Sequence, residues 1–379
     1  MSSPRKAGAN ASNQWQGIKA LPNGVQTDPP SAAHIIADKI DREGPISLGD
    51  YMAIANGVYY ASKDPLGEEG DFVTAPEISQ MFGEIIGIWL ADLWLRKGSP
   101  DHCHYVELGP GRGTLASDAL RSMAKFGCHP TIHFVETSPV LKARQADLHP
   151  DAIWHEDIAS LPENGPLLIV ANEFFDALPI EQFVSTASGW RRHMVMRDRS
   201  KFVVIPSEET TEDRIGSSTS GFPEDTILER SPVSVEITGN IANRIAKQGG
   251  SLLIIDYGYS RPGTGSTLQA VKDHMPISPF DSPGTCDLTA HVDFHTLANI
   301  ARTRLLAIHG PAEQGQWLKS LGIDQRAESL MVASPKEADA IVAAHQRLTH
   351  VDEMGRLFQV MAATAIDWPQ PEGFSYGGE

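Results

Sequence analysis

The chain of 379 residues contains little cysteine and no recognisable pattern of metal ligands. Its three cysteines, Cys103, Cys128 and Cys286, stand far apart and form no C-x-x-C pair. This spacing argues against a disulfide framework and a structural zinc site, and it is typical of a reducing compartment. The 14 histidines show no H-E-x-x-H or similar ligand spacing, so we predict that no metal is bound.

Long apolar runs and an excess of basic charge are also absent. Because no run of 18 apolar residues occurs, we expect no insertion into a membrane. Lys and Arg number 31 against 48 Asp and Glu, and the net charge of −17 argues against nucleic acid as a partner. Residues 1–30 are polar and lack the apolar core of a signal peptide, so we interpret them as a disordered tail.

An alternation of short apolar segments and helical segments begins after residue 102. Five apolar segments predict buried strands, at residues 103–108, 131–136, 152–155, 167–171 and 252–256. Helical segments lie between them, such as residues 114–126, which end at Gly127. Near-continuous apolar strands joined by helices are typical of a parallel sheet covered on both faces, so we expect an α/β fold.

Other patterns flank and interrupt this alternation. Apolar residues recur at helical spacing between Ile78 and Leu93, after a capping-box pattern at 74–77. Short strand patterns at 182–185, 190–196 and 202–205 predict an inserted β element, and a second capping box is expected at 334–337. We therefore expect these regions: a tail (1–30), a helical N-terminal region with a lid loop (31–100), the first half of an α/β core (101–180), the inserted element (181–235), the second half with a long irregular loop at 258–287 (236–316), and a helical C-terminal region (317–379).

The most specific motif is the glycine turn after the first predicted strand, YVELGPGRGT at residues 105–114. Gly109, Gly111 and Gly113 alternate with other residues, whereas a dinucleotide fingerprint would place its third glycine at Thr114. Glycine allows positive φ and lets backbone N–H groups approach a ligand. Together with Glu107, the pattern is similar to the first motif of class I S-adenosylmethionine (SAM) methyltransferases. A plain strand-to-helix turn is the alternative.

Acidic residues follow the next two predicted strands, at the sheet edge where open α/β folds bind ligands. Glu136 is positioned to accept hydrogen bonds from both ribose hydroxyls of an adenosine, or it is a solvated acid at the start of a helix. Asp157 is positioned to accept from an adenine amino group while Ile158 packs on the ring. The alternative for Asp157 is a simple helix cap.

The fourth predicted strand ends in the unusual sequence ANEFFDALP, residues 171–179. It brings Asn172, Glu173 and Asp176 to the same edge. In class I methyltransferases this position faces both the methyl group and its acceptor. The alternative is a surface turn whose acids have no role.

These motifs together resemble the MidA-like family of class I methyltransferases, bacterial and mitochondrial proteins related to the mitochondrial complex I assembly factor. The matching segments are 70–79 (GDFVTAPEIS), 106–114 (VELGPGRGT), 172–179 (NEFFDALP), 253–258 (LIIDYG), 287–293 (DLTAHVD) and, more weakly, 352–358 (DEMGRLF). The resemblance implies a seven-stranded Rossmann-like methyltransferase sheet with an inserted element, and SAM as the cofactor. Residues 313–318 (EQGQWL) depart from the family pattern.

The mitochondrial members of that family are protein arginine methyltransferases that produce symmetric dimethylarginine on a subunit of respiratory complex I. The resemblance therefore implies an arginine-bearing protein substrate, in the cytoplasm of a bacterium or the mitochondrial matrix of a eukaryote. A pair of carboxylates can hold a guanidinium by bidentate hydrogen bonds, and one of them can accept its proton. Our candidates for this pair are Glu173 and Asp176.

Three further residues are weaker candidates. Glu77 is a third carboxylate, unless it serves only the capping box. His291 is a candidate proton acceptor or a structural histidine, and Asp256 either lines the site or caps a loop. Two other functions stay open: methylation of a small molecule or another protein residue, and a SAM-binding assembly factor without essential catalysis. The glycine spacing disfavours a nicotinamide oxidoreductase.

Overall fold

The computed structural model describes residues 31–62, 74–211, 221–272 and 275–374. The expected tail at 1–30 and most of the expected lid loop at 64–74 lie outside these ranges. Within them, every helix is too short or too polar to cross a membrane.

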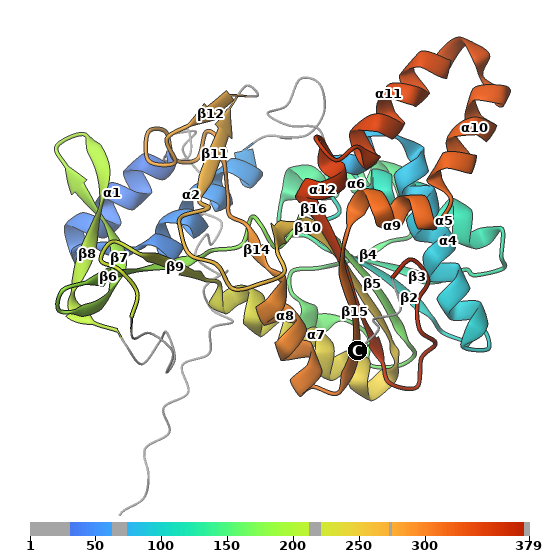
Figure 1. Cartoon of the computed structure of the whole chain (residues 1–379), viewed down its shortest axis with the longest axis horizontal. Helices are drawn as coiled ribbons and strands as arrows, with labels where there is room; N and C mark the ends of the chain where they lie inside the picture. Colours follow the sequence, from blue (N-terminus) through green and yellow to red (C-terminus); the bar gives the residue numbers. More distant parts are fainter. Residues whose placement is uncertain (1–30, 63–73, 212–220, 273–274, 375–379) are drawn as a thin grey trace, which may run out of the picture. The chain divides into compact units, whose positions relative to one another are not determined.

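The central sheet follows the path β15-β16-β10-β5-β2-β3-β4 (Figure 1). Its strands are β2 (His104–Leu108), β3 (Thr131–Val135), β4 (Ile153–His155), β5 (Leu167–Asn172), β10 (Gly250–Tyr259), β15 (Leu306–Glu313) and β16 (Phe358–Ala365). The strands from β10 to β4 are parallel, and β16 runs antiparallel to both of its neighbours. The short β14 (Val292–Asp293) pairs with the end of β10. This arrangement confirms the expected α/β sheet.

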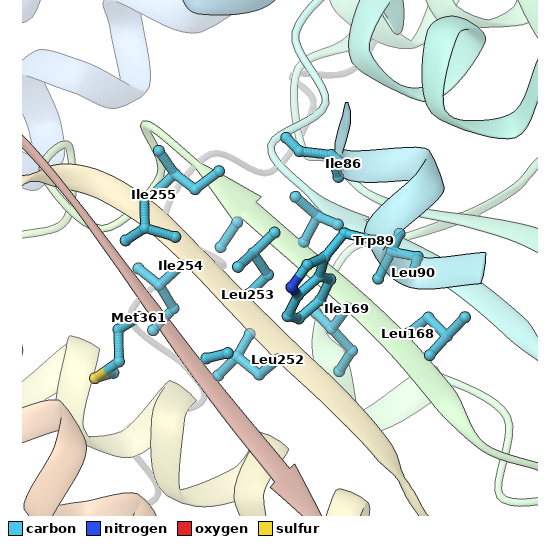
Figure 2. Close-up of a cluster of buried hydrophobic side chains, with 14 of the residues drawn as sticks. Ile86, Trp89, Leu90, Leu168, Ile169, Leu252, Leu253, Ile254, Ile255 and Met361 are labelled. Atoms are coloured by element: carbon cyan, nitrogen blue, oxygen red, sulfur yellow. The ribbon is translucent and has the colours of Figure 1, made fainter. Parts of the chain in front are cut away.

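Helices precede and connect the strands of this sheet, as expected from the alternation. They include α4 (Gln80–Arg96), α5 (Thr114–Ala124), α6 (Pro139–Leu148), α7 (Pro232–Gln248) and α8 (Phe294–Thr303). Figure 2 shows α4 directing Ile86, Trp89 and Leu90 towards apolar side chains of the sheet, among them Ile169 and Leu253. Such strands are buried on both faces, which explains their continuous apolar sequences.

The C-terminal region is not wholly helical, and that expectation was wrong for one segment. It contains α9 (Gln314–Ser320), α10 (Ile323–Ala333), α11 (Ala338–Thr349) and α12 (Met354–Leu357), but then β16 enters the sheet between β10 and β15. The sequence of β16 is rich in alanine and shows no strand alternation, because the strand is buried along nearly its whole length. Pairing with two neighbouring strands outweighs the weak intrinsic preference of this sequence for a strand.

The inserted strands form a second sheet with the order β1-β7-β6-β9 and β8 paired to β7. Its strands are β1 (Ile46–Ser47), β6 (Glu181–Thr186), β7 (Gly189–Asp198), β8 (Lys201–Thr210) and β9 (Ile227–Arg230). The first two helices, α1 (Ala32–Glu43) and α2 (Leu48–Ser62), share a buried cluster with this sheet, including Tyr51 and Val195. They therefore belong with the inserted element, and not with α4 as the single region 31–100 implied.

The segment 258–287 is more ordered than its composition suggested. It contains β11 (Gln269–Lys272) and β12 (Met275–Ile277), which form a small sheet with β13 (Asp287–Thr289). Ala270 and Leu288 are buried in the cluster around α2, so packing stabilises these short strands. The expectation of an irregular loop was wrong here.

Both capping-box predictions were also wrong. Thr74 makes no side-chain cap at α3 (Ala75–Ile78), and Ser334 makes none before residues 335–337. The chain is extended at Ser79, whose hydroxyl instead accepts from the Met81 N–H at 3.2 Å and begins α4. The break leaves α3 as a separate turn that carries Glu77.

Candidate active site

The glycine turn between β2 and α5 has a backbone that other residues rarely adopt. Gly109, Gly111 and Gly113 have φ angles of +59°, +54° and +85°. A Cβ on Gly109 would lie 3.0 Å from the Phe174 ring, and one on Gly113 would lie 3.0 Å from the ring of His149. Conformation therefore favours glycine at all three positions, and space favours it at Gly109 and Gly113. The turn leads into the first turn of α5, whose N–H groups receive no side-chain cap.

Glu136 follows β3 and lies 8% exposed beside this turn. Its Oε1 accepts from the N–H groups of Thr137 at 2.8 Å and Ser138 at 2.7 Å. Its Oε2 accepts from Gln145 Nε2 at 3.2 Å. Burial raises the pKa of Glu136, and these donors oppose that rise. The carboxylate is thus held in one orientation at the sheet edge.

Asp157 caps a short helical turn, residues Ile158–Ser160. Its Oδ1 accepts from the N–H groups of Ala159 at 2.8 Å and Ser160 at 3.2 Å. The capping alternative is therefore present in the structure, and contact with adenine remains a prediction. Ile158 is partly buried against the main core.

Glu107 lies beneath the glycine turn with 3% of its surface exposed. Its Oε2 accepts from the Tyr105 hydroxyl at 2.6 Å. Burial raises the pKa of Glu107 to about 8, so this carboxyl is largely protonated at neutral pH. The structure thus provides Glu107 with a partner inside the protein, and its contact with a cofactor remains a prediction.

Glu173 stands immediately after β5 in a strained conformation, with φ at +49°. Its N–H donates to the Ile255 carbonyl at 2.9 Å, which fixes the turn to β10. Its Oε1 accepts from the Ala75 N–H at 3.2 Å and from Asn172 Nδ2 at 3.1 Å. Residues held this way cluster at functional sites, because the surrounding structure must offset the strain.

Asp176 and Asp256, which are buried, form a cluster of carboxyls with the partly buried Glu173. Burial and the neighbouring Asp176 raise the pKa of Glu173 to about 7. Burial raises the pKa of Asp176 to about 6, and a hydrogen bond from the Tyr257 hydroxyl opposes it. Burial, followed by the two neighbouring acids, raises the pKa of Asp256 far above its usual value. Such a cluster retains a proton near neutral pH or attracts a cation.

Asp256 has a different role from the other two acids in this cluster. It is fully buried, and its Oδ2 accepts from the N–H groups of Phe175 at 3.0 Å and Asp176 at 3.2 Å. Its Oδ1 accepts from the N–H of Tyr257 at 3.0 Å. Both oxygens are thus engaged with backbone, so Asp256 braces the loop, as its capping alternative implied.

Two buried oxygens at this site have no hydrogen-bond partner among the residues that the structure describes. They are Asn172 Oδ1 and Asp176 Oδ1. Buried acceptors without partners are rare, and at a ligand site they indicate where a polar ligand binds. The glycine turn and the fixed Glu136 carboxylate lie at the same edge of the sheet. Together with Asn172 and Asp176 they are suited to bind SAM and, next to it, a second ligand that donates hydrogen bonds.

Glu77 lies with the glycine turn. Its Oε1 accepts from the Thr114 hydroxyl at 2.5 Å, and its Oε2 lies 3.7 Å from Arg112 Nη1. The same turn of helix, α3, donates the Ala75 N–H to Glu173. The segment therefore joins the glycine turn to the carboxyl cluster.

His291 approaches the cluster only through an aromatic ring. Its imidazole packs edge-on against Tyr257 with ring centroids 5.7 Å apart, and the Tyr257 hydroxyl is hydrogen-bonded to Asp176. Burial lowers the pKa of His291. Its role as a proton acceptor thus remains a prediction, with Tyr257 as the intervening group.

The sequence reasoning missed several residues that hold the carboxyl cluster. Asn56 of α2 donates from Nδ2 to the carbonyls of Ala177 at 3.0 Å and Leu288 at 2.8 Å. The Tyr60 hydroxyl donates to Asp287 Oδ2 at 2.8 Å. Tyr257 and Asp287 lie inside the segments 253–258 and 287–293 that resemble the family, so the sequence motifs could have identified them as site residues. Asn56 lies in no motif, and only the tertiary contact identifies it.

Comparison with known proteins agrees with this geometry. Residues 85–312 match the family model described as "Putative S-adenosyl-L-methionine-dependent methyltransferase". Because this match covers more than half of the chain, the protein belongs to this family of SAM-dependent methyltransferases, and SAM is its cofactor. The fold class and cofactor expected from the sequence are thereby confirmed.

Particular relatives are similar along most of the chain. The mitochondrial protein arginine methyltransferase NDUFAF7 of Xenopus tropicalis is 35% identical over 361 residues, covering 85% of this chain and 83% of the relative. Its counterpart in Homo sapiens is 34% identical over 364 residues, covering 86% and 81%. A Burkholderia thailandensis protein solved with S-adenosyl-homocysteine has the same fold, with a TM-score of 0.80, 23% identity, and coverage of 100% and 99%.

Proposed function

We propose that this protein transfers the methyl group of SAM to the guanidinium of an arginine side chain in a protein. The observation that carries the proposal is the carboxyl pair Glu173 and Asp176 after the end of β5, beside the unpartnered oxygens of Asn172 and Asp176. The names of the relatives, protein arginine methyltransferases, support it.

The chemistry of an arginine acceptor explains the need for two acids. Guanidinium is permanently protonated and its charge is delocalised, so its nitrogens are weak nucleophiles. Glu173 and Asp176 would hold the planar group, localise its charge on one side and orient another nitrogen towards the methyl group. Bound SAM supplies a methyl group activated by its positive sulfur. Because the pKa of Glu173 is about 7, Glu173 is suited to accept the proton released on transfer.

Other residues would hold the cofactor in the same proposal. The turn of Gly109, Gly111 and Gly113 presents backbone to the ligand, and Glu136 accepts the ribose hydroxyls. The remaining predicted cofactor contacts are made by Glu107, Thr114, Asp157, Ile158 and Asn172. Glu77 supports the turn through Thr114 and is a weaker candidate for acceptor binding. His291, which packs edge-on against Tyr257, is the weaker candidate for the proton acceptor.

The substrate can be described more finely within the proposal. A net charge of −17 would attract a cationic, arginine-bearing protein. We propose symmetric dimethylation of a respiratory complex I subunit, because the family resemblance implies it. The place of action would be the cytoplasm in a bacterium or the mitochondrial matrix in a eukaryote; the names of the eukaryotic relatives include the word mitochondrial.

The substitution Glu173→Gln tests the carboxylate pair. It keeps the size and shape of the side chain but removes the charge and the proton acceptor. We expect SAM affinity by calorimetry to stay within about twofold, and methyl transfer to an arginine peptide to fall on the order of a hundredfold or more. The control is Glu163→Gln, an exposed acid before β5 whose side chain is 77% exposed.

The outcomes separate the competing functions. Transfer at the wild-type rate by Glu173→Gln would contradict the carboxylate model. Labelling of a lysate with tritiated SAM, followed by mass spectrometry, identifies the acceptor. A methylated metabolite or another modified residue would replace arginine in the proposal, and SAM binding without any methylated product would favour an assembly factor.

A further inference from the structure

We propose that Gln145 is a positioning residue for SAM, because one buried side chain links three segments of the cofactor edge. Gln145 lies on α6 and is fully buried. Its Nε2 donates to the Gly111 carbonyl at 2.7 Å and to Glu136 Oε2 at 3.2 Å. Its Oε1 accepts from Trp154 Nε1 of β4 at 2.8 Å. The inference rests on the SAM-binding role proposed for Glu136 and the glycine turn.

The orientation of this amide is fixed by its partners. The Gly111 carbonyl can only accept, and the Trp154 indole N–H can only donate. The second hydrogen of Nε2 therefore points to Glu136. Both amide hydrogens and one lone pair of Oε1 are thus used within the protein, and the side chain is fully buried. Gln145 therefore contacts the groups proposed to bind SAM, and not SAM itself. A residue with this arrangement positions its neighbours and takes no direct part in the reaction.

The contact with Glu136 gives Gln145 an electrostatic effect as well as a geometric one. Lys142, also on α6, is the charged residue that acts on the Glu136 carboxyl. The other neighbouring elements contribute backbone groups: the His155 carbonyl of β4 accepts from the Glu136 N–H, and the Tyr60 carbonyl of α2 accepts from Ser138. Gln145 is therefore the neutral side-chain donor that favours an ionised Glu136, the form that accepts hydrogen bonds from ribose.

Two substitutions should perturb this link with opposite dependence on pH. Gln145→Met has a similar volume but donates nothing, so Glu136 protonates more readily and SAM binding weakens as the pH falls towards 6. Gln145→Glu places a second carboxyl against Glu136. The two share a proton at low pH and repel each other once both are ionised, so SAM binding weakens as the pH rises towards 8.

The matched control is Gln248→Met. Gln248 Nε2 also donates two hydrogen bonds, to the backbone carbonyls of Pro162 at 3.2 Å and Gly165 at 2.8 Å, but at the opposite end of the strands. The control loses as many donated hydrogen bonds, from a side chain that is partly buried. If the loss of amide donors alone weakened SAM binding, both methionine variants would show it.

The experiment measures the Kd of SAM by calorimetry at about pH 6, 7 and 8, and the KM and kcat of methyl transfer at neutral pH. For Gln145→Met we expect the Kd and KM of SAM to rise about tenfold with kcat little changed, and Gln248→Met to behave as wild type. Equal effects of the two methionine variants, or parallel pH profiles for both Gln145 variants, would overturn the inference. Should Gln145→Met fail to fold, the alkaline weakening of Gln145→Glu decides the matter. A wild-type protein that binds no SAM would instead refute the cofactor site itself.

Discussion

Acidification should destabilise the protein through three buried histidines that cross neighbouring strands of the central sheet. His133 Nε2 lies 3.1 Å from His104 Nδ1, and His133 Nδ1 lies 2.9 Å from His155 Nε2. His104 Nε2 must donate to the Asn164 carbonyl at 2.7 Å, so each ring in turn accepts from the next when all three are neutral. His133, 3% exposed at the centre of this chain, lies away from water, so burial and the two neighbouring imidazoles disfavour the charge that a second proton would bring.

The magnitude follows from the pKa of His133, which burial, and then the two neighbouring histidines, lower from 6.5 to about 4. Because the folded-state pKa lies below the unfolded one, the stabilising contribution is fully present above about pH 6.5 and is lost as the pH falls towards 4. The full shift corresponds to about 3 kcal/mol, of which about 2 kcal/mol is lost between pH 7 and pH 5.

The assay compares urea unfolding of the wild type and His133→Gln at these two pH values, followed by tryptophan fluorescence. Buried acids with raised pKa values titrate equally in both proteins. The difference between the two pH dependences of the unfolding free energy therefore reports on His133. We expect the unfolding free energy of the variant to depend less on pH by about 2 kcal/mol. His295→Gln, at an exposed histidine of α8, should leave the dependence unchanged. Equal pH dependence of wild type and His133→Gln would refute the argument.

Two further predictions concern the turn and the packing of α4. Gly109→Ala combines a φ of +59° with a Cβ 3.0 Å from Phe174, so calorimetry should find SAM affinity reduced and thermal unfolding should occur at lower temperature. Glu84→Gln removes the carboxylate that accepts from Arg326 Nε at 2.7 Å and Nη2 at 3.0 Å, linking α4 to α10. Urea unfolding should indicate a loss of about 1–3 kcal/mol with kcat unchanged, and a lower kcat would contradict a purely structural role.

The sequence predicted most of the parallel part of the sheet, because those strands carry a local signal. The segments expected at 103–108 and 167–171 correspond to β2 (His104–Leu108) and β5 (Leu167–Asn172). Each is a short apolar run that ends at a turn, which is what burial on both faces requires. The same property concealed β16, whose alanine-rich sequence becomes a strand only between two partners.

The residues of the candidate site likewise fall into those with a local sequence signal and those without one. Residues that follow strands in the chain, such as Glu136 and Glu173, are found from order alone, since parallel strands end at one edge of the sheet. Residues that reach this edge of the sheet from other parts of the chain cannot be found from the order of the strands. Gln145 and Asn56 carry no motif, and Glu77 matched a capping pattern that the fold does not use.

By itself the sequence determined the class of fold, the family and the cofactor, because glycine turns, buried strands and strand-end acids are local consequences of backbone conformation and burial. Only the tertiary structure decided which groups act on one another. The raised pKa of Glu173 arises from burial and from Asp176, and Asp256, distant in the chain, completes the carboxyl cluster. Desolvation and charge coupling depend on proximity in space, which the order of residues does not specify.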